Sequence, residues 1–211
     1  PINGILGMTY LIKEAFYQHI TPEEQEYFES LNRSSKRIIR TTDLVLNYSK
    51  FKSSNVEINY VSVDLVKVFQ EIINDNKLLI DKKNINVVFD YTKYIPLINS
   101  DLFCITEIFS NIVNNAVKFT ENGIVEIRIH QLNNTQLCVE IIDTGIGISN
   151  EYLPDLFEPY IQEENGYTRT FDGIGLGLAL TKLLIDKIGA SINVKSKKGE
   201  GTTITVSLNI L

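Results

Sequence analysis

The periodicity of the apolar residues changes once along the chain, and this change constrains the fold more than any other feature. From Tyr27 to Tyr48, apolar and small residues recur at alternating steps of four and three, the heptad pattern of helices that pack nearly side by side. Beyond KSSN (52–55), apolar residues alternate with polar ones, as in strands with one buried face. The chain therefore combines a helical segment with a segment of mixed helices and strands.

Residues 1–53 are predicted to form a helical hairpin. The first helix carries apolar residues at helical spacing, namely Ile2, Ile5, Ile12 and Phe16. The second helix begins in HITPEEQ, where we expect Thr21 to cap it, Pro22 to open it and Glu24 to complete a capping box. Its apolar stripe comprises Tyr27, Leu31, Ser34, Ile38, Thr41, Val45 and Tyr48. Because a two-helix hairpin buries little surface, we expect a homodimer in which two hairpins form a four-helix bundle.

Residues 54–211 are predicted to form a two-layer α/β sandwich with a mixed sheet, so the fold class of the chain is α+β. Alternating apolar residues predict strands around 125–129, 137–141 and 204–210. Helical patterns near 64–81, 101–118 and 175–188 lie between these strands in the sequence. We expect the helices to stack on one face of the sheet.

The composition excludes several classes of protein. Hydrophobic residues make up 44% and charged residues 22% of the 211 residues, as in ordinary globular domains. The net charge of −6 gives no basic field, so no nucleic-acid partner is expected. No apolar run approaches about 18 residues, so we expect no direct membrane contact in this segment. Cys104 and Cys138 lack CxxC spacing, which favours reduced thiols in the cytoplasm.

The helix expected at 101–118 carries a polar stripe. Glu107, Asn111, Asn115 and Lys118 are separated by four, four and three residues and therefore share one face. Such a stripe fits a hydrated Mg²⁺ ion and a phosphate, because a single amide oxygen is a suitable protein ligand for Mg²⁺. A solvated helix face explains the same pattern equally well.

Two further segments also allow two interpretations each. VEIIDTGIGI (139–148) ends a strand with Asp143, which either accepts a hydrogen bond from the adenine amine or forms a tight turn. DGIGLGLALTK (172–182) places Gly173, Gly175 and Gly177 where a helix begins. The free N–H groups of a helix start favour phosphate, whereas glycines also permit close packing of a helix on a sheet.

The order of five segments removes this ambiguity. NIVNNAVKFT, DTGIGI, LFEPYIQ, GIGLGLAL and GEGTT occur in succession. Together they resemble the nucleotide-binding boxes of the sensor histidine kinases, within the gyrase, heat-shock-protein-90, histidine-kinase and MutL ATPase superfamily. The resemblance covers essentially the whole chain, and PINGILGM resembles the stretch that follows the family's phosphoacceptor motif.

The resemblance implies a site for ATP and Mg²⁺. It implies that Asn115 is the magnesium ligand, that Asn111 is the first Asn of the same box, and that Lys118 and Arg169 are cations near the phosphates. Asp143 matches the residue that reads the adenine amine. The other nucleotide contacts that it implies are Phe119, Gly145, Gly147, Gly173, Gly175, Gly177, Leu178 and Thr203.

The resemblance also implies a function. Residues 1–53 match the dimerisation hairpin and 54–211 the catalytic ATP-binding domain of a histidine kinase. The γ-phosphoryl group is expected to pass to a histidine upstream of Pro1, and then to an aspartate in the receiver domain of a response regulator. Neither His19 nor His130 matches the acceptor, so this chain alone is not expected to autophosphorylate. We expect the chain to be the cytoplasmic portion of a larger sensor, and sensors of this family are often bound to a membrane.

Two alternatives stay open at this point. Asp172 and Ile174 replace a glycine and a hydroxyl residue in the family's usual G-G-T-G-L-G-L, as in a dimerisation module whose nucleotide site has decayed. The other alternative is a clamp-type ATPase. Such ATPases carry a water-activating Glu where this chain has Asn111, and an amide cannot act as a base, which favours a kinase.

Overall fold

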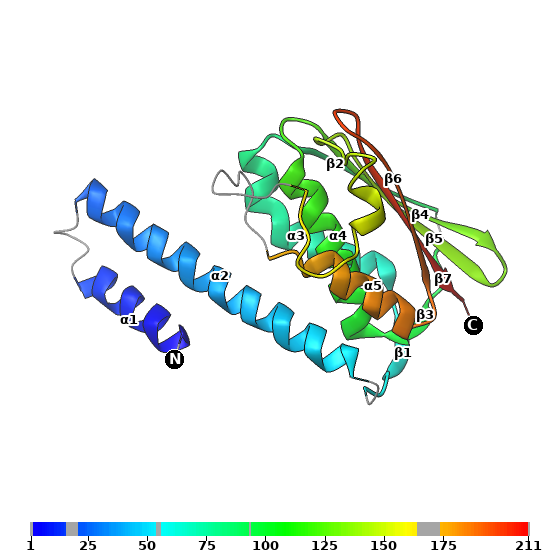
Figure 1. Cartoon of the computed structure of the whole chain (residues 1–211), viewed down its shortest axis with the longest axis horizontal. Helices are drawn as coiled ribbons and strands as arrows, with labels where there is room; N and C mark the ends of the chain where they lie inside the picture. The colour runs from blue at the N-terminus through cyan, green and yellow to red at the C-terminus, as the bar shows by residue number, and fades with distance from the viewer. Residues whose placement is uncertain (1, 16–20, 54–55, 93, 164–173, 211) are drawn as a thin grey trace. The chain divides into compact units, whose positions relative to one another are not determined.

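The computed structural model describes residues 2–15, 21–53, 56–92, 94–163 and 174–210. The chain divides into two compact units, Pro1–Ser49 and Lys50–Leu211 (Figure 1). The first unit is helical, and the second combines helices with strands, as the change of periodicity predicted.

The helical unit contains α1 (Ile2–Ala15) and most of α2 (Pro22–Lys52). The predicted capping box is present at the start of α2. The backbone N–H of Thr21 donates to the Glu24 carboxylate (2.8 Å), and the N–H of Glu24 donates to the Thr21 hydroxyl (3.3 Å). These bonds satisfy two of the backbone donors that a helix start leaves without partners. Phe16 and His19 lie outside the described residues.

The apolar stripe of α2 is exposed within one chain. Tyr27 is 62% exposed, Leu31 45%, Ile38 53% and Val45 38%. In a helix whose other residues are mainly polar, these exposed side chains form a largely apolar stripe that the described residues of the helical unit leave uncovered.

The second unit contains a five-stranded mixed sheet in the order β2-β4-β5-β7-β6 and a separate pair, β1-β3. Only β2 and β4 are parallel, and the other neighbours in the large sheet are antiparallel. Three helices lie on one face of this sheet, which confirms the predicted sandwich (Figure 1). The elements, in chain order, are β1 (Tyr60–Val63), α3 (Leu65–Lys82), β2 (Asn86–Tyr91), β3 (Ile98–Asp101), α4 (Leu102–Phe119), β4 (Ile124–Asn133), β5 (Gln136–Asp143), the short 3₁₀ helix η2 (Leu153–Asp155), α5 (Gly177–Lys187), β6 (Ser191–Lys197) and β7 (Gly201–Asn209).

The core lies between the sheet and α3, α4 and α5. In β4, β5 and β7, nine of the apolar residues predicted to face inward are buried, whereas Ile210 lies beyond the end of β7 and is half-buried. The nine are Val125, Ile127, Ile129, Leu137, Val139, Ile141, Ile204, Val206 and Leu208. The helices contribute Phe69 and Phe109, whose ring centroids lie 4.7 Å apart. Both aromatic rings are fully buried, so they contribute strongly to the stability of the unit.

Both cysteines are free and buried. Burial raises the pKa of the Cys104 thiol to about 12, so it stays protonated and unreactive near neutral pH. Among the residues that the structure describes, none of the helices is both long and apolar enough to cross a membrane.

Removing the buried ring of Phe109 should destabilise the second unit. We expect Phe109→Ala to lower the free energy of unfolding by about 3–5 kcal/mol, because it removes apolar contacts and leaves a cavity. Leu78→Ala is the control, since Leu78 is 87% exposed on α3, and its effect should stay within about 0.5 kcal/mol. Urea denaturation measures both variants, and equal losses of stability would contradict this view of the core.

Candidate functional site

The polar stripe of α4 is partly buried rather than solvated. Asn111 is 7% exposed, and Asn115 and Lys118 are half-buried. The amide nitrogen of Asn111 has no hydrogen-bond partner among the described residues. A buried amide without a partner costs free energy, so its presence on this face points to a ligand that completes it.

The start of α5 lies against the same amide. A Cβ atom on Gly177, the first residue of α5, would lie 3.5 Å from the Asn111 Oδ1 atom. No described side chain caps this helix at Leu176, so the N–H groups of its first turn remain available. Leu178, also predicted to contact nucleotide, lies half-buried in that first turn. An uncapped helix start beside a buried amide donor has the properties of an anion site.

Gly175 is required by its backbone conformation. Its φ is +71°, and a Cβ atom there would lie 2.8 Å from the carbonyl oxygen of Ile161. The Gly175 carbonyl accepts a hydrogen bond from the N–H of Tyr160 (3.0 Å), which ties the segment before α5 to the segment after η2. A side chain at position 175 would separate these two segments.

Asp143 ends β5 in a largely enclosed position. Its Oδ1 atom accepts a hydrogen bond from the backbone N–H of Gly145 (2.9 Å). Burial raises the pKa of this carboxyl, and backbone hydrogen bonds from Gly145 and Thr202 offset that effect only in part. A further hydrogen-bond donor would stabilise the ionised form of this carboxylate, and an exocyclic amine is such a donor.

The strand register places Thr202 and Thr203 differently relative to Asp143. Asp143 is paired with Thr202, whereas Thr203 is paired with Ile142. Since neighbouring residues of a strand point to opposite faces, Thr203 lies on the face of the sheet away from Asp143. Thr202 is the threonine beside the carboxylate, a placement that follows from the pairing of β5 with β7, and the nucleotide contact of Thr203 stays a prediction.

The loop that follows Asp143 is held by α4 on one side. The N–H of Ile146 donates to the carbonyl oxygen of Phe119 (3.2 Å), and a Cβ atom on Gly145 would lie 2.5 Å from that oxygen. Lys118, the neighbour of Phe119, places its ammonium 4.9 Å from the centroid of the Phe119 ring. The structure therefore brings Lys118, Phe119 and Asp143 to one region through backbone contacts.

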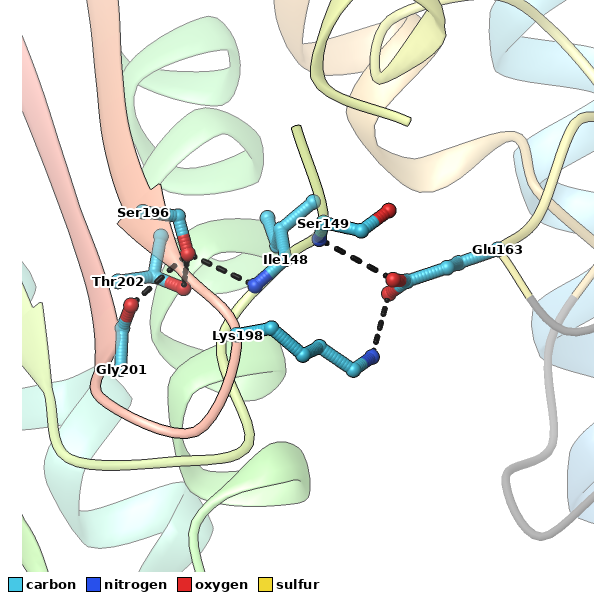
Figure 2. A network of polar contacts seen from close by, with 7 residues as sticks. All are labelled: Ile148, Ser149, Glu163, Ser196, Lys198, Gly201 and Thr202. Atoms are coloured by element: carbon cyan, nitrogen blue, oxygen red, sulfur yellow. Dashed lines mark hydrogen bonds and ion pairs between the residues drawn. The ribbon is translucent and has the colours of Figure 1, made fainter. Parts of the chain in front are cut away.

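The turn between β6 and β7 holds the same loop on the other side (Figure 2). The Ser196 hydroxyl accepts from the N–H of Ile148 (2.8 Å) and donates to the Gly201 carbonyl (2.8 Å). Gly147 has a φ of +61°, and a Cβ atom there would lie 2.0 Å from the carbonyl oxygen of Lys197. Only glycine fits this approach.

Figure 2 also shows an ion pair that the sequence pattern did not reveal. The Glu163 carboxylate accepts from the N–H of Ser149 (3.1 Å) and pairs with the Lys198 ammonium (2.9 Å). Burial raises the pKa of Glu163, but the contacts with Lys198 and Ser149 outweigh it and leave the pKa below its usual value. These residues are far apart in the sequence and follow no spacing rule, so only the fold brings them together.

Some predicted site residues cannot be placed. Arg169 and Gly173, together with Asp172, lie within 164–173, outside the described residues. Asn111, Asn115, Gly177 and the first turn of α5 are near one another, and Asp143, Gly145, Gly147 and Phe119 form a second group. The short end of α4, from Asn115 to Phe119, joins the two groups.

The residues present fit Mg²⁺ only together with a phosphate. Within the described ranges, no group of three or more His, Cys, Asp or Glu side chains is arranged to hold a metal ion. The amide oxygens of α4 are nonetheless the hard oxygen ligands that Mg²⁺ accepts, and this ion commonly keeps water and phosphate oxygens as its other ligands. The donor set therefore suits a metal that arrives with a nucleotide.

Comparison with known proteins decides the family. The histidine kinase-, DNA gyrase B-, and HSP90-like ATPase family matches residues 101–210, which include α4, the Asp143 loop and α5. The chain belongs to this family. Relatives of the chain within it include sensor histidine kinases, as the five motifs predicted.

One relative of this histidine kinase chain is the autoinducer 2 sensor kinase/phosphatase LuxQ of Vibrio parahaemolyticus. It is 33% identical over 217 residues, which cover 100% of this chain and 25% of LuxQ. The chain thus spans about a quarter of the length of such curated relatives.

Two solved kinase structures have the same fold. Full-length ShkA in complex with AMPPNP has a TM-score of 0.80 at 25% identity, over 99% of this chain and 42% of ShkA. ThkA in complex with the response regulator TrrA has a TM-score of 0.69 at 20% identity, over 100% of this chain and 60% of ThkA.

The raised pKa of Asp143 makes the stability of this kinase chain depend on pH. A carboxyl whose folded pKa exceeds its unfolded value, about 3.9, stabilises the fold fully below that value. This stabilisation is lost as the pH rises through the folded pKa. Asp143→Asn removes the titration, so the difference in free energy of unfolding between the ligand-free variant and the wild type should shift in favour of the variant as the pH rises from about 4.

Urea denaturation of the ligand-free protein across that pH range measures the effect. Asp75→Asn is the control, because Asp75 is an exposed carboxylate on α3, and its curve should run parallel to that of the wild type. A parallel curve for Asp143→Asn as well would show that the Asp143 carboxyl is not destabilised by burial.

Proposed function

We propose that this chain is the ATP-dependent core of a protein-histidine kinase. It binds Mg–ATP in the second unit and transfers the γ-phosphoryl group to a histidine outside these residues. In this step the bond from the γ-phosphorus to the β–γ bridging oxygen breaks, a bond from the histidine nitrogen to phosphorus forms, and ADP leaves. The phosphoryl group then passes to an aspartate of a response regulator, a relay that the ThkA–TrrA complex supports by analogy of fold.

The observation that carries this proposal is the buried Asn111 amide nitrogen, which has no hydrogen-bond partner among the described residues, beside a start of α5 that no described side chain caps. Among the described residues, a buried amide donor and a helix start without a side-chain cap lie together here. Phosphate accepts hydrogen bonds from both kinds of donor, and the positive end of the helix dipole favours its charge. A triphosphate is the ligand that links this site to an adenine at Asp143.

Several of the predicted residues have a role in this proposal. The amide oxygen of Asn115 binds Mg²⁺, and the Lys118 ammonium neutralises phosphate charge, with Arg169 as a second cation. Asp143 accepts from the adenine amine, while Gly145 and Gly147 let the loop approach Phe119 and Lys197 closely. The bound Mg²⁺ ion offsets the negative charge of the phosphates, and the protein otherwise acts by positioning.

A kinase fits this site better than a hydrolase. Hydrolysis of ATP by a clamp-type enzyme needs a base that activates water, and Asn111 carries an amide that cannot take a proton. A histidine nucleophile needs no such base, because its neutral ring nitrogen already has a lone pair for in-line attack. His130 lies on β4, away from the polar stripe of α4, and is not proposed as the acceptor.

Label from Mg–[γ-³²P]ATP should appear on a separate hairpin protein that carries a family acceptor histidine. The reaction should be slow, because two separate molecules lack the effective concentration of a tethered pair. Asn115→Ala should abolish it by removing the magnesium ligand. Asn114→Ala is the matched control on α4, and phosphotransfer should survive this change.

Autoradiography after denaturing electrophoresis measures this transfer. The chain incubated alone with labelled Mg–ATP should acquire no acid-labile label. Label on His19 or His130 of the isolated chain would contradict the assignment of the acceptor. Equal transfer by the two asparagine variants would contradict the role of Asn115.

We also propose that residues 1–53 form a dimerisation hairpin and residues 54–211 the catalytic domain. The exposed apolar stripe of α2 supports this proposal, because a partner that covers such a surface removes it from water and so lowers the free energy. A second copy offers the same stripe, and a two-fold arrangement of two hairpins buries both.

Ile38→Ala should weaken the dimer about tenfold or more, because each dimer buries this side chain twice. Lys36→Ala is the control on the opposite face of α2, and its effect should be small. Sedimentation velocity over a range of protein concentrations gives both dissociation constants. A wild-type chain that stays monomeric at the highest concentration would contradict dimerisation through this stripe.

A further inference from the structure

The end of α4 is held by a residue from a different element. Lys83 follows the last turn of α3, and its ammonium donates three hydrogen bonds to backbone carbonyl oxygens at the end of α4, those of Val117 (3.1 Å), Lys118 (2.5 Å) and Thr120 (3.1 Å). An ammonium has three N–H donors, so these carbonyls use all of them. The side chain of Lys83 is only 14% exposed.

These contacts meet a specific need of the helix. The last carbonyls of an α-helix have no partners within it, and they form the negative end of the helix dipole. A buried ammonium placed among them satisfies both the carbonyls and its own charge. Lys83 also pairs with Glu121 (2.8 Å), but Glu121 is 65% exposed, so water screens this ion pair and it contributes little.

The backbone around Lys83 is joined to the same region. The Lys83 carbonyl accepts from the N–H of Asn122 (3.1 Å), and the N–H of Asn86 donates to the carbonyl of Gly123 (2.8 Å). The segment between α3 and β2 is therefore paired with the segment between α4 and β4. This pairing fixes the point from which the Lys83 side chain reaches the end of α4.

The three carbonyls that Lys83 holds enclose the part of the chain that carries Lys118 and Phe119, two residues of the proposed nucleotide site. Lys118 is the proposed phosphate cation, and Phe119 follows it directly. The Phe119 carbonyl accepts from the N–H of Ile146 in the loop after Asp143 (3.2 Å). A shift of the backbone at 117–120 would therefore move both the cation and the loop that carries the adenine carboxylate.

We propose that Lys83 is a positioning residue of the nucleotide site. It touches neither nucleotide nor acceptor, and it acts by holding the last turn of α4, so that Lys118, Phe119 and the Asp143 loop keep their relative places. This inference rests on the proposed function for the identity of the ligand. The local claim, that the ammonium orders the end of α4, stands on the structure alone.

The test compares three variants of the full chain. Lys83→Met keeps the length of the side chain without its donors, Lys83→Arg keeps charge and several donors, and Lys82→Met is the control, because Lys82 is an exposed neighbour in the last turn of α3. Calorimetry with Mg–AMPPNP should show binding by Lys83→Met at least about tenfold weaker than wild type. Lys83→Arg should recover most of that loss, and Lys82→Met should bind as wild type does.

Amide hydrogen exchange supplies a readout that needs no nucleotide. In Lys83→Met, exchange should accelerate at the N–H groups of Thr120 and Ile146, while Ile127 and Val139 in the sheet keep their wild-type rates. Equal acceleration at all four positions would indicate a general loss of stability and would overturn the proposal. Unchanged exchange at Thr120 and Ile146 would overturn it too.

The two arms separate failure of this inference from failure of the proposed function. If the wild-type chain does not bind Mg–AMPPNP, the proposed function fails, and the exchange arm still decides whether Lys83 orders the end of α4. If Lys83→Met does not fold, Lys83→Gln replaces it in both arms. Glu121→Gln should bind nucleotide as wild type does, and a tenfold loss there would assign the effect to the ion pair and overturn the role given to the carbonyl contacts.

Discussion

The hydrogen bond from the N–H of Ile146 to the carbonyl oxygen of Phe119 is the contact on which the arrangement of the site depends. It joins the helix that carries Asn111 and Asn115 to the loop after the strand that carries Asp143. The contact is possible because residue 145 is glycine, since a Cβ atom there would lie 2.5 Å from the same oxygen. This backbone contact therefore fixes the relative positions of two groups of polar residues that lie on different elements.

The loop after Asp143 is also fixed from its other side before any ligand binds. The Ser196 hydroxyl accepts from Ile148, and the N–H of Gly199 donates to the carbonyl of Ile146 (2.8 Å). Because its backbone groups already have partners within the protein, the loop loses little conformational entropy when a ligand arrives. The glycines in DTGIGI thus permit close contacts with neighbouring backbone, and they confer order here rather than flexibility.

The local sequence predicted what depends on local physics. Three features could be predicted because each rests on spacing within one segment. They are the capping box at Thr21 and Glu24, the three helices of the second unit, and the inward faces of β4, β5 and β7. β1 and β3 have four residues each, and β2 (NVVFDY) lacks strict alternation, so none of them was predicted. β6 was not predicted either, although Ile192 and Val194 alternate with polar residues. The pairing of the strands could not be predicted, because register depends on contacts between distant segments. For the same reason, the sequence did not indicate which of Thr202 and Thr203 lies beside Asp143. The same limit applies to Lys83, which lies 34 residues from the first carbonyl that it holds.

The ligand-free site keeps two groups in states that cost stability. Asn111 has a buried amide nitrogen without a described partner, a cost of about 1–3 kcal/mol, and burial raises the pKa of Asp143 because it disfavours the ionised carboxylate. The apolar core around Phe69 and Phe109 offsets these costs, so they do not prevent folding. A bound nucleotide would remove both at once, because phosphate oxygens accept from the amide and the adenine amine donates to the carboxylate. Much of the affinity expected of this site therefore comes from groups that the fold leaves incomplete, and an amide at position 111 can take part in binding without providing the base that hydrolysis requires.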